Sequence, residues 1–290
     1  MNGVVLINKP QGFTSFDVVA VMRRVLGTKK IGHTGTLDPM ATGVLPLLVG
    51  KATRLCDRLP VEDKTYKATF RLGLTTDTLD ITGKVLTQTE SQVTQEQLLA
   101  CFPKYTGDIL QVPPMYSAIS VNGVRLYDLA RQGKTVERQA RPIHIDHITL
   151  LESHPDTQTF VIEVACSKGT YIRSLIDDLG RDLGVGATLT ALCRTKACGF
   201  SLENCIDLEQ ARAMTPEALL QPTEVALTHY KGVTITAAQA TRFQNGGALD
   251  LDRLPLSKTA QGLFRVYNPD HSLLGLGLVE DGQLKIQCHL

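Results

Sequence analysis

The chain has 290 residues, of which 43% are hydrophobic and 20% are charged, and its formal net charge at pH 7 is +1. Its length and composition are those of a globular protein with one large domain and one small one. No apolar run is long enough to span a bilayer, and the first residues lack the layout of a signal peptide. We therefore expect no membrane partner and a cytoplasmic location.

Metal sites and cofactor sites also lack their sequence signatures. The seven cysteines form no C-x-x-C pair, and no histidine lies at a zinc-site spacing from the closest three, Cys193, Cys198 and Cys205. No Walker motif and no dinucleotide fingerprint occurs, so we expect no metal and no cofactor. The near-zero net charge neither favours nor excludes nucleic acid, because RNA binding requires only a local basic surface.

The chain opens with a predicted strand and a predicted helix. Gly3 to Ile7 is an apolar run typical of a short strand, and apolar residues recur at helical spacing from Val18 to Leu26. Ser15 is the expected N-cap of this helix, and Gly27 is expected to end it.

The most informative stretch follows at Ile31 to Gly50, I-G-H-T-G-T-L-D-P-M-A-T-G-V-L-P-L-L-V-G. Three glycines surround a single acid, Asp38, and the Pro39 that follows disfavours a helical backbone at that acid. The apolar run Val44 to Val49 has the length of a buried strand, which would anchor the loop in a core. The stretch therefore predicts one carboxylate held on a fixed loop at the entrance of a strand.

This stretch resembles the catalytic loop of the TruB family of tRNA pseudouridine synthases, and further motifs extend the resemblance along nearly the whole chain. The resemblance implies that Asp38 is the indispensable catalytic residue. It also implies that His33 contacts the RNA, although a neutral turn histidine would fit the same pattern. The family's first motif corresponds to N-K-P-Q-G-F-T-S at residues 8–15, with Lys9 as a brace beneath the loop rather than a catalytic group.

After a predicted short helix at Lys51 to Leu59, Lys64 to Leu72 alternates apolar and polar residues, as a half-buried strand does. By itself, Tyr66 in this strand would be a core aromatic residue. The family's K-x-Y motif lies here, however, and the resemblance implies that Tyr66 stacks against a flipped-out target base. The segment Thr75 to Asp80 is similar to the family's T-D-T-x-D, and its acids are expected to order a loop.

Pro113 to Arg141 is a basic segment that contains only two acids. It interleaves tyrosines with basic residues, which suits phosphate contacts and base stacking, although a solvated insertion would look similar. The segment resembles the family's thumb, a mobile insertion that closes on the RNA stem-loop. The resemblance implies that its five basic residues bind RNA: Arg125, Arg131, Lys134, Arg138 and Arg141.

Paired strands are predicted at Pro142 to Leu151 and Gln158 to Cys166. A helix follows, because apolar residues share one helical face: Ile172, Leu175, Ile176, Leu179 and Leu183. The family pattern G-T-Y-I-R at residues 169–173 implies that Arg173 is the partner of Asp38, since a guanidinium stays charged and binds a carboxylate in a fixed fork. The same pattern implies that Tyr171 packs against the base pocket.

The rest of the chain closes the large domain and adds a small one. The family segment L-x-x-L-x-R-T implies that Leu192 packs against the substrate base, although an ordinary core leucine fits nearly as well. Short helices are expected at Asp207 to Ala213 and Pro216 to Leu220, and Thr236 is expected to cap a helix. Three strands with hairpin signals follow at Gly262 to Tyr267, Leu273 to Val279 and Gln283 to Gln287.

The predicted fold class is α/β (α+β), with a mixed, largely antiparallel central sheet flanked by helices. Its strands lie in hairpin-like pairs rather than in regular β-α-β alternation. We expect a catalytic domain at residues 1–228, with a thumb at about 113–141. The last residues, 229–290, resemble the PUA-like domain of bacterial family members.

One Asp, one Arg, two Tyr and one Leu suit isomerisation of a bound uridine. The resemblance implies that the target is uridine 55 in the T-loop of tRNA, and we expect a monomer that binds the T-stem-loop. Asp38 would act either as a nucleophile at C1′ or as a base that removes a ribose proton.

Two other classes of function remain open. A non-catalytic tRNA-binding chaperone would keep the basic thumb but need not retain Asp38, Arg173 and Tyr66 together. A hydrolytic glycosidase normally uses two carboxylates, and the sequence offers one credible acid.

Overall fold

The computed structural model describes residues 1–61, 63–121 and 123–290, and the chain divides into two units. The first unit contains Met1–Asp38, Val44–Glu62 and Cys198–Leu290, and the second contains Pro39–Gly43 and Asp63–Ala197. The boundary crosses the predicted catalytic loop directly after Asp38. Each unit is therefore described by itself.

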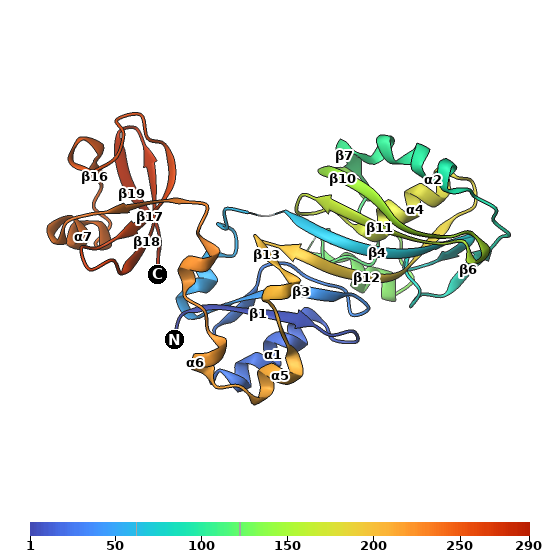
Figure 1. The fold of residues 1–290 in the computed structure, drawn as a ribbon, viewed down its shortest axis with the longest axis horizontal. Helices are drawn as coiled ribbons and strands as arrows, with labels where there is room; N and C mark the ends of the chain where they lie inside the picture. Colours follow the sequence, from blue (N-terminus) through green and yellow to red (C-terminus); the bar gives the residue numbers. More distant parts are fainter. Residues whose placement is uncertain (62, 122) are drawn as a thin grey trace. The chain divides into compact units, whose positions relative to one another are not determined.

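The first unit is built on several strands, whose course along the chain can be followed in Figure 1. Its strands are β1 (Gly3–Lys9), β2 (Ile31–His33), β3 (Thr42–Val49), β13 (Phe200–Ser201) and β14 (Ile206–Asp207), with β1 parallel to β14 and β2 antiparallel to β3. Successive side chains of a strand point to opposite faces, so Val5 and Ile7 enter one apolar cluster while Val4 and Leu6 enter another. This two-sided burial explains why β1 and β3 are nearly continuous apolar runs.

Helices α1 (Ser15–Val25), α5 (Leu208–Ala213) and α6 (Pro216–Leu219) cover the first of these clusters, and α1 and α5 contact each other. The N-cap of α1 is Thr14 rather than the predicted Ser15. Its hydroxyl accepts from the backbone N–H of Asp17, whose carboxylate accepts in return from the N–H of Thr14. Gly27 has a φ of 62° and follows the helix end, as predicted.

The first unit also contains three short 3₁₀ helices, η1 (Gly50–Leu55), η4 (Leu202–Asn204) and η5 (Thr223–Ala226). The helix predicted at Lys51 to Leu59 is thus a shorter 3₁₀ helix. Its buried residues Ala52 and Leu55 face the second apolar cluster.

The last part of the chain forms a five-stranded sheet with a core of its own. Its order is β15-β17-β18-β19-β16, with β15 (Lys231–Thr234), β16 (Leu249–Asp250), β17 (Gly262–Tyr267), β18 (Leu273–Glu280) and β19 (Gln283–His289). Helix α7 (Ala237–Gln244) and η6 (Leu251–Arg253) pack on this core. The helix capped by Thr236 and the three predicted strands are confirmed, whereas β15 and β16 were not predicted.

This small sheet also shares apolar packing with the rest of the first unit. Leu276 and Cys288 belong to the same buried cluster as Leu48 and Leu55. At the end of the chain, Arg54 donates to the carbonyl of His289 at 3.1 Å. The small sheet therefore has its own core and an apolar attachment.

The second unit contains an antiparallel sheet in the order β12-β4-β11-β10-β7 (Figure 1). Its strands are β4 (Lys64–Leu72), β7 (Gly107–Gln111), β10 (Arg141–His154), β11 (Thr159–Cys166) and β12 (Ala187–Ala197). Each is antiparallel to its neighbours, and Thr42 and Gly43 pair in parallel with β12. The predicted fold class, a mixed and largely antiparallel sheet flanked by helices, is confirmed.

Helix α4 (Ile172–Asp182) packs on β4 and β12, and α2 (Gln95–Cys101) packs against α4. The apolar stripe predicted for α4 is buried except for the half-buried Leu183, which follows the helix as its C-cap. Beneath it, the rings of Phe70 and Phe160 stack across paired strands with centroids 5.8 Å apart. This packing fixes the helix that carries Arg173.

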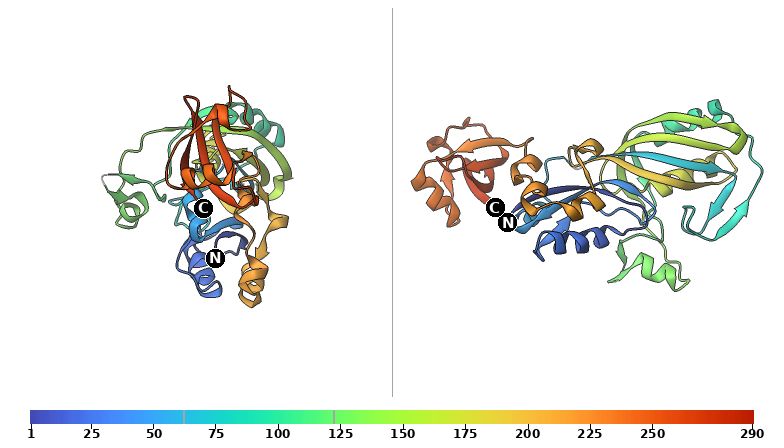
Figure 2. Two further views of the ribbon diagram at one scale, coloured as in Figure 1. Left: turned by 90° about the vertical axis from the view of Figure 1, so that its left-hand side faces the viewer. Right: turned by 60° about the horizontal axis from the view of Figure 1, so that its bottom comes forward.

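The smaller elements of the second unit are β5 (Leu74–Thr76), β6 (Val85–Gln88), β8 (Ser120–Val121), β9 (Val124–Arg125), α3 (Leu126–Arg131), η2 (Phe102–Tyr105) and η3 (Pro155–Thr157). β8, β9 and α3 belong to the segment 113–141, which we call the thumb; its residue Asn122 lies outside the described residues. The thumb is drawn in green in Figure 2 and extends away from the sheet of its own unit in both views.

Candidate active site

The loop that carries Asp38 lies between β2 and β3 and is tied to the start of α1. The backbone N–H of Leu37 donates to Ser15 Oγ at 2.8 Å, and the Ser15 hydroxyl lies 3.3 Å from the carbonyl oxygen of Leu37. Ser15 is 1% exposed, so these bonds are shielded from water and are stronger for it. The tie fixes the backbone one residue before Asp38, which is half-buried.

A buried lysine holds the turn that leads into α1. Lys9 is fully buried, and its Nζ donates to the carbonyls of Pro10 at 2.9 Å and Phe13 at 2.6 Å. A buried ammonium group requires such acceptors, because an unpaired one is costly. The turn, and through it Ser15, is held in place by these bonds.

The close packing at the start of β3 requires Gly43. This residue has a φ of +106°, and a Cβ there would lie 2.2 Å from the carbonyl oxygen of Arg194. The absent side chain lets β3 approach β12 at Arg194, which is fully buried. Gly32 differs, because it has no positive φ and the nearest atom to its Cβ would be 3.6 Å away, so a side chain fits there.

Tyr66 and Leu192 lie on one face of the second unit's sheet. In the antiparallel pairing of β4 with β12, Tyr66 is opposite Arg194 and Ala68 is opposite Leu192. Directly opposed residues share a face, and so do residues two apart on one strand, so Tyr66 and Leu192 are diagonal neighbours. Tyr66 is 6% exposed and Leu192 is 7% exposed.

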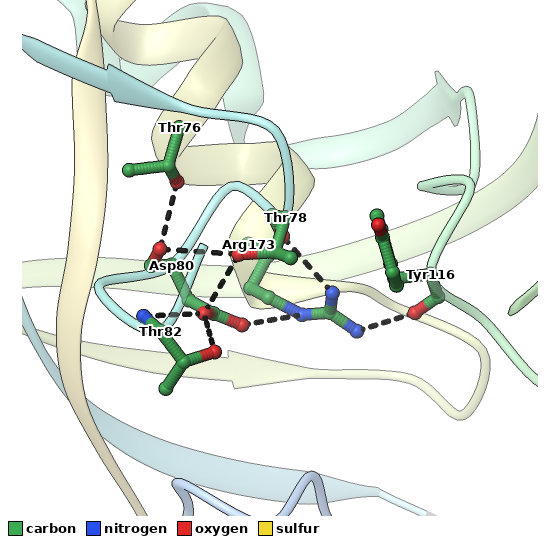
Figure 3. Close-up of polar contacts among 6 residues, drawn as sticks. All are labelled: Thr76, Thr78, Asp80, Thr82, Tyr116 and Arg173. Atoms are coloured by element: carbon green, nitrogen blue, oxygen red, sulfur yellow. Dashed lines mark hydrogen bonds and ion pairs between the residues drawn. The ribbon is translucent and has the colours of Figure 1, made fainter. Parts of the chain in front are cut away.

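Arg173 lies in the first turn of α4, where it is 4% exposed. Its Nη1 donates to the carbonyl of Thr78 at 3.1 Å, and its Nη2 donates to the carbonyl of Tyr116 at 2.8 Å (Figure 3). Its Nε lies 3.9 Å from Oδ2 of Asp80. The guanidinium thus joins the loop after β5 to the start of the thumb.

Asp80 was not among the predicted site residues, although its segment was expected to order a loop. That expectation is confirmed, because Asp80 Oδ1 accepts from the Thr78 hydroxyl at 2.9 Å and from the Thr82 hydroxyl at 2.6 Å (Figure 3). Its carbonyl also accepts from the Thr76 hydroxyl at 2.7 Å. The other carboxylate oxygen faces Arg173. The sequence carried no signal for this contact, because a buried arginine needs an acidic neighbour and the burial of Arg173 became known only from the structure.

Helix α4 is held at both ends. At its start, the backbone of the half-buried Tyr171 is hydrogen-bonded by the side chain of Gln111. At its end, Asp182 accepts from Lys104 and from the hydroxyl of Tyr105, and the Lys104 hydrogen bond lowers the pKa of Asp182. These contacts fix the axis of the helix and therefore the direction in which Arg173 projects.

Two of the five basic thumb residues hold the thumb's own backbone. Arg125 donates to the carbonyl of Ala118, and Arg138 donates to the carbonyl of Pro113 at 3.2 Å. Each guanidinium keeps other donors, so these bonds leave capacity for a ligand.

The other three basic thumb residues are exposed. The guanidinium carbon of Arg131 lies 5.3 Å from the ring centroid of Tyr127, within cation–π distance. Lys134 bonds only locally, to Gln132 at 3.1 Å among the contacts described. Arg141 begins β10, where it pairs with Gln111.

The predicted site residues are divided between the two units. Asp38 and His33 belong to the first, and His33 is the half-buried last residue of β2. Tyr66, Tyr171, Arg173, Leu192 and the thumb belong to the second. The pairing of Asp38 with Arg173 therefore stays a prediction.

In residues 1–61, 63–121 and 123–290, no group of three or more His, Cys, Asp or Glu side chains is arranged to hold a metal ion. Over the same ranges, no helix combines the length and the apolar surface needed to cross a membrane. The groups assembled at α4 are a guanidinium, a carboxylate and backbone carbonyls. They can orient a polar substrate and hold a charge in a fixed position.

Sequence models of three protein families match consecutive parts of the chain. The model described as TruB family pseudouridylate synthase (N terminal domain) matches residues 23–172. The tRNA pseudouridylate synthase B C-terminal domain matches residues 173–228. The model described as Pseudouridine synthase II TruB, C-terminal, matches residues 232–287.

Individual relatives match over almost their whole length. The tRNA pseudouridine synthase B of Clostridium tetani is 45% identical over 278 residues, which are 96% of this chain and 95% of that protein. The protein of the same name from Stutzerimonas stutzeri is 41% identical, over 98% of this chain and 94% of its own. Among solved structures, a chain in the crystal structure of a Cbf5-Nop10-Gar1 complex matches with a TM-score of 0.74 and 26% identity, over 99% of this chain and 84% of that one.

Proposed function

This chain belongs to the TruB family of pseudouridine synthases, and on that premise we propose that it converts uridine 55 in the T-loop of tRNA to pseudouridine. The observation that carries the proposal is the full-length match to relatives named tRNA pseudouridine synthase B, at 41–45% identity. The loop next to Asp38 is tied by buried bonds, and Arg173 is fixed in a buried network, as a site that acts by positioning requires.

In the proposed reaction, the bond between C1′ and N1 of the uridine breaks and a bond between C1′ and C5 forms. N1 gains a proton and C5 loses one, so no oxidant, reductant or cofactor is needed. Asp38 supplies the carboxylate, either as a nucleophile at C1′ or as a base for a ribose proton. Arg173 keeps that carboxylate ionised and in place.

The other predicted residues hold the flipped base. Tyr66 stacks against the uracil, and Leu192, its diagonal neighbour on the sheet, packs beside it. Tyr171 orients groups near the C5 proton, and His33 contacts the RNA where the loop is opened. Tyr66, Leu192 and Tyr171 thus act on a base that has left its stack, and His33 acts on the RNA around it.

We assign residues 1–228 to the catalytic domain, with the thumb at 113–141 closing on the T-stem-loop, and residues 229–290 to a PUA-like domain. The separate core of the last five strands supports that division. The protein is proposed to act as a monomer in the cytoplasm.

The test is incubation of the purified chain with an unmodified tRNA transcript, without added metal or cofactor, followed by mapping of pseudouridine along the transcript. A single pseudouridine at position 55 is expected, and none in a transcript that carries cytidine there. Binding without conversion would identify a chaperone instead. Release of free uracil would identify a glycosidase.

A further inference from the structure

Gln111 is the last residue of β7, two residues before the thumb begins at Pro113, and is 3% exposed. Its carboxamide makes a two-way contact with one residue. The backbone N–H of Tyr171 donates to Gln111 Oε1 at 2.8 Å, and Gln111 Nε2 donates to the carbonyl of Tyr171 at 3.0 Å. An N–H can only donate and a carbonyl can only accept, so the contact determines which way the amide is turned.

This contact lies where α4 starts. Tyr171 is the residue before the helix, and its own side chain does not cap the helix. Its carbonyl also accepts from the N–H of Leu175 at 3.1 Å, which closes the first turn. Gln111 therefore fixes the point from which α4 begins, two residues before Arg173.

The neighbouring residues repeat the connection. The Ser174 hydroxyl donates to the carbonyl of Val112 at 3.1 Å, and Arg173 donates to the carbonyl of Tyr116 at 2.8 Å. The segment from Gln111 to Tyr116, where β7 leads into the thumb, is thus bonded to three residues at the start of α4, and the Gln111 contact is buried in that set.

We propose that Gln111 is a positioning residue for the isomerisation: its carboxamide holds the Tyr171 backbone, and this contact sets the placement of the Tyr171 ring and the Arg173 guanidinium. The inference rests on the proposed function, because it concerns the rate of that reaction. Gln111 itself does not contact the substrate. Its substitution affects the reaction by displacing the Tyr171 ring and the Arg173 guanidinium.

The first test is Gln111→Met, which keeps the length of the side chain and removes both hydrogen bonds. The single-turnover rate on saturating tRNA is expected to fall by about 10- to 100-fold, as expected for a small misplacement of reacting groups. The tRNA dissociation constant is expected to change little, because the exposed thumb residues are untouched.

Gln158 offers a matched control in the same unit. It is a second buried glutamine whose Oε1 accepts from the N–H of Val93 at 3.0 Å and whose Nε2 lies 3.3 Å from the carbonyl oxygen of Val93. Gln158→Met removes the same kind of contact from a segment without proposed site residues, together with the bonds of Gln158 to the Ser91 hydroxyl at 2.6 Å and to the carbonyl of Pro155 at 2.9 Å. It is expected to lower the melting temperature as Gln111→Met does, and to leave the single-turnover rate unchanged.

The second test is Gln111→Glu, whose effect depends on pH. The ionised carboxylate can accept from the Tyr171 N–H but cannot donate to the carbonyl, whereas the protonated acid can do both. Burial raises the pKa of a carboxyl group, so the acid form gains population as pH falls from about 8.5 to about 5.5. The rate of this variant relative to wild type should rise over that range, while the relative rate of Gln111→Met should stay flat.

The outcomes separate this inference from the proposed function. If the wild-type chain forms no pseudouridine at any position of the tRNA, the proposed function fails and this inference fails with it. If the wild type is active, equal rates for wild type and Gln111→Met overturn the inference alone. An equal loss of rate in Gln158→Met also overturns the inference, and so does a rate of Gln111→Glu relative to wild type that does not change with pH. If Gln111→Met does not fold, the pH dependence of Gln111→Glu decides the question.

Discussion

The first turn of α4 and the thumb both carry arginines, but they hold them in opposite ways. Arg173 is 4% exposed, and its guanidinium is bonded to the carbonyls of Thr78 and Tyr116, which lie 95 and 57 residues away in the chain. Arg131 is exposed, and the contact described for it is with Tyr127, four residues away on the same short helix.

The difference indicates that Arg173 is suited to a role in the reaction and Arg131 to a role in RNA binding. A guanidinium fixed by distant segments has one orientation, which a reaction that depends on proximity requires. An exposed guanidinium on a local support can follow a phosphate backbone, and its contribution falls with salt. We therefore expect substitutions near α4 and Asp38 to lower the rate, and substitutions in the thumb to lower the affinity.

The largest effect is expected from Asp38→Asn, which should lower isomerisation by on the order of 10⁴-fold or more, because the amide can act neither as nucleophile nor as base. Affinity for tRNA should stay within a few-fold, since the amide has nearly the same shape. Single-turnover assays and filter binding measure the two quantities. The control is Asp57→Asn, because Asp57 is an exposed acid of the same unit and its substitution should leave the rate unchanged. Substantial pseudouridine formation by Asp38→Asn would show that Asp38 is not the catalytic carboxylate.

The comparison is tested most directly by making one substitution in both regions. Arg173→Lys should lower the single-turnover rate by roughly 10²- to 10³-fold, because one ammonium cannot replace a planar fork with several fixed donors. Arg131→Lys should be close to wild type, because the charge remains in an exposed and adaptable place.

The pH profile of Arg173→Lys separates geometry from protonation. The lost rate should recover little as pH rises toward about 9, where an ordinary Asp is fully ionised. Near-wild-type rates at neutral pH would discard the pairing of Arg173 with Asp38. Full rescue at high pH would make Arg173 a group that sets the protonation state of the acid instead.

In the thumb, neutralising Arg131 and Lys134 together should weaken tRNA binding and flatten its salt dependence. Each lost phosphate contact removes about 0.7 to 0.9 from the slope of log affinity against log salt, so two remove about 1.4 to 1.8. Adding Arg138→Gln should weaken binding further, because that guanidinium also holds the carbonyl of Pro113.

Lys67→Gln is the control for the thumb variants, since Lys67 is half-exposed and already paired with Glu152 at 3.0 Å. It should leave the salt slope unchanged. A slope that is unchanged in the thumb variants as well would show that the thumb does not contact phosphates.

The smallest effect on the reaction itself is expected from ending the chain after residue 228. The small five-stranded sheet has its own core, and the proposed catalytic residues lie outside it, so some activity should remain at saturating tRNA while affinity falls several-fold. The melting temperature should also fall, because Leu276 and Cys288 would no longer cover Leu48 and Leu55. A folded, soluble truncation with no activity at saturating tRNA would place the small sheet in the active site.

Many of the longer regular elements could be predicted from local pattern, although the eleven-residue strand β12 was not. The alternation in β4 and the apolar stripe of α4 are set by side-chain periods of two and about 3.6 residues, which are readable in a short window. β14 and β16 have two residues each, too few to show any period, so they exist only because longer strands pair with them.

The candidate site was predicted less completely, for a physical reason. The motifs pointed to Asp38 and Arg173 through the family resemblance, and Ser15 was interpretable only as a helix cap. Its bonds to Leu37, 22 residues away, and the burial of Asp80 beside Arg173 depend on where distant segments meet.

The sequence by itself determined most of the longer helices and several of the longer strands, because propensity and period act over a few neighbouring residues. Only the tertiary structure decided that a glutamine at the end of β7 bonds the start of α4, and that an arginine off the apolar stripe is buried. Buried polar groups take whichever partners the packed chain brings within hydrogen-bond distance, and chain folding over tens of residues, rather than local pattern, selects those partners.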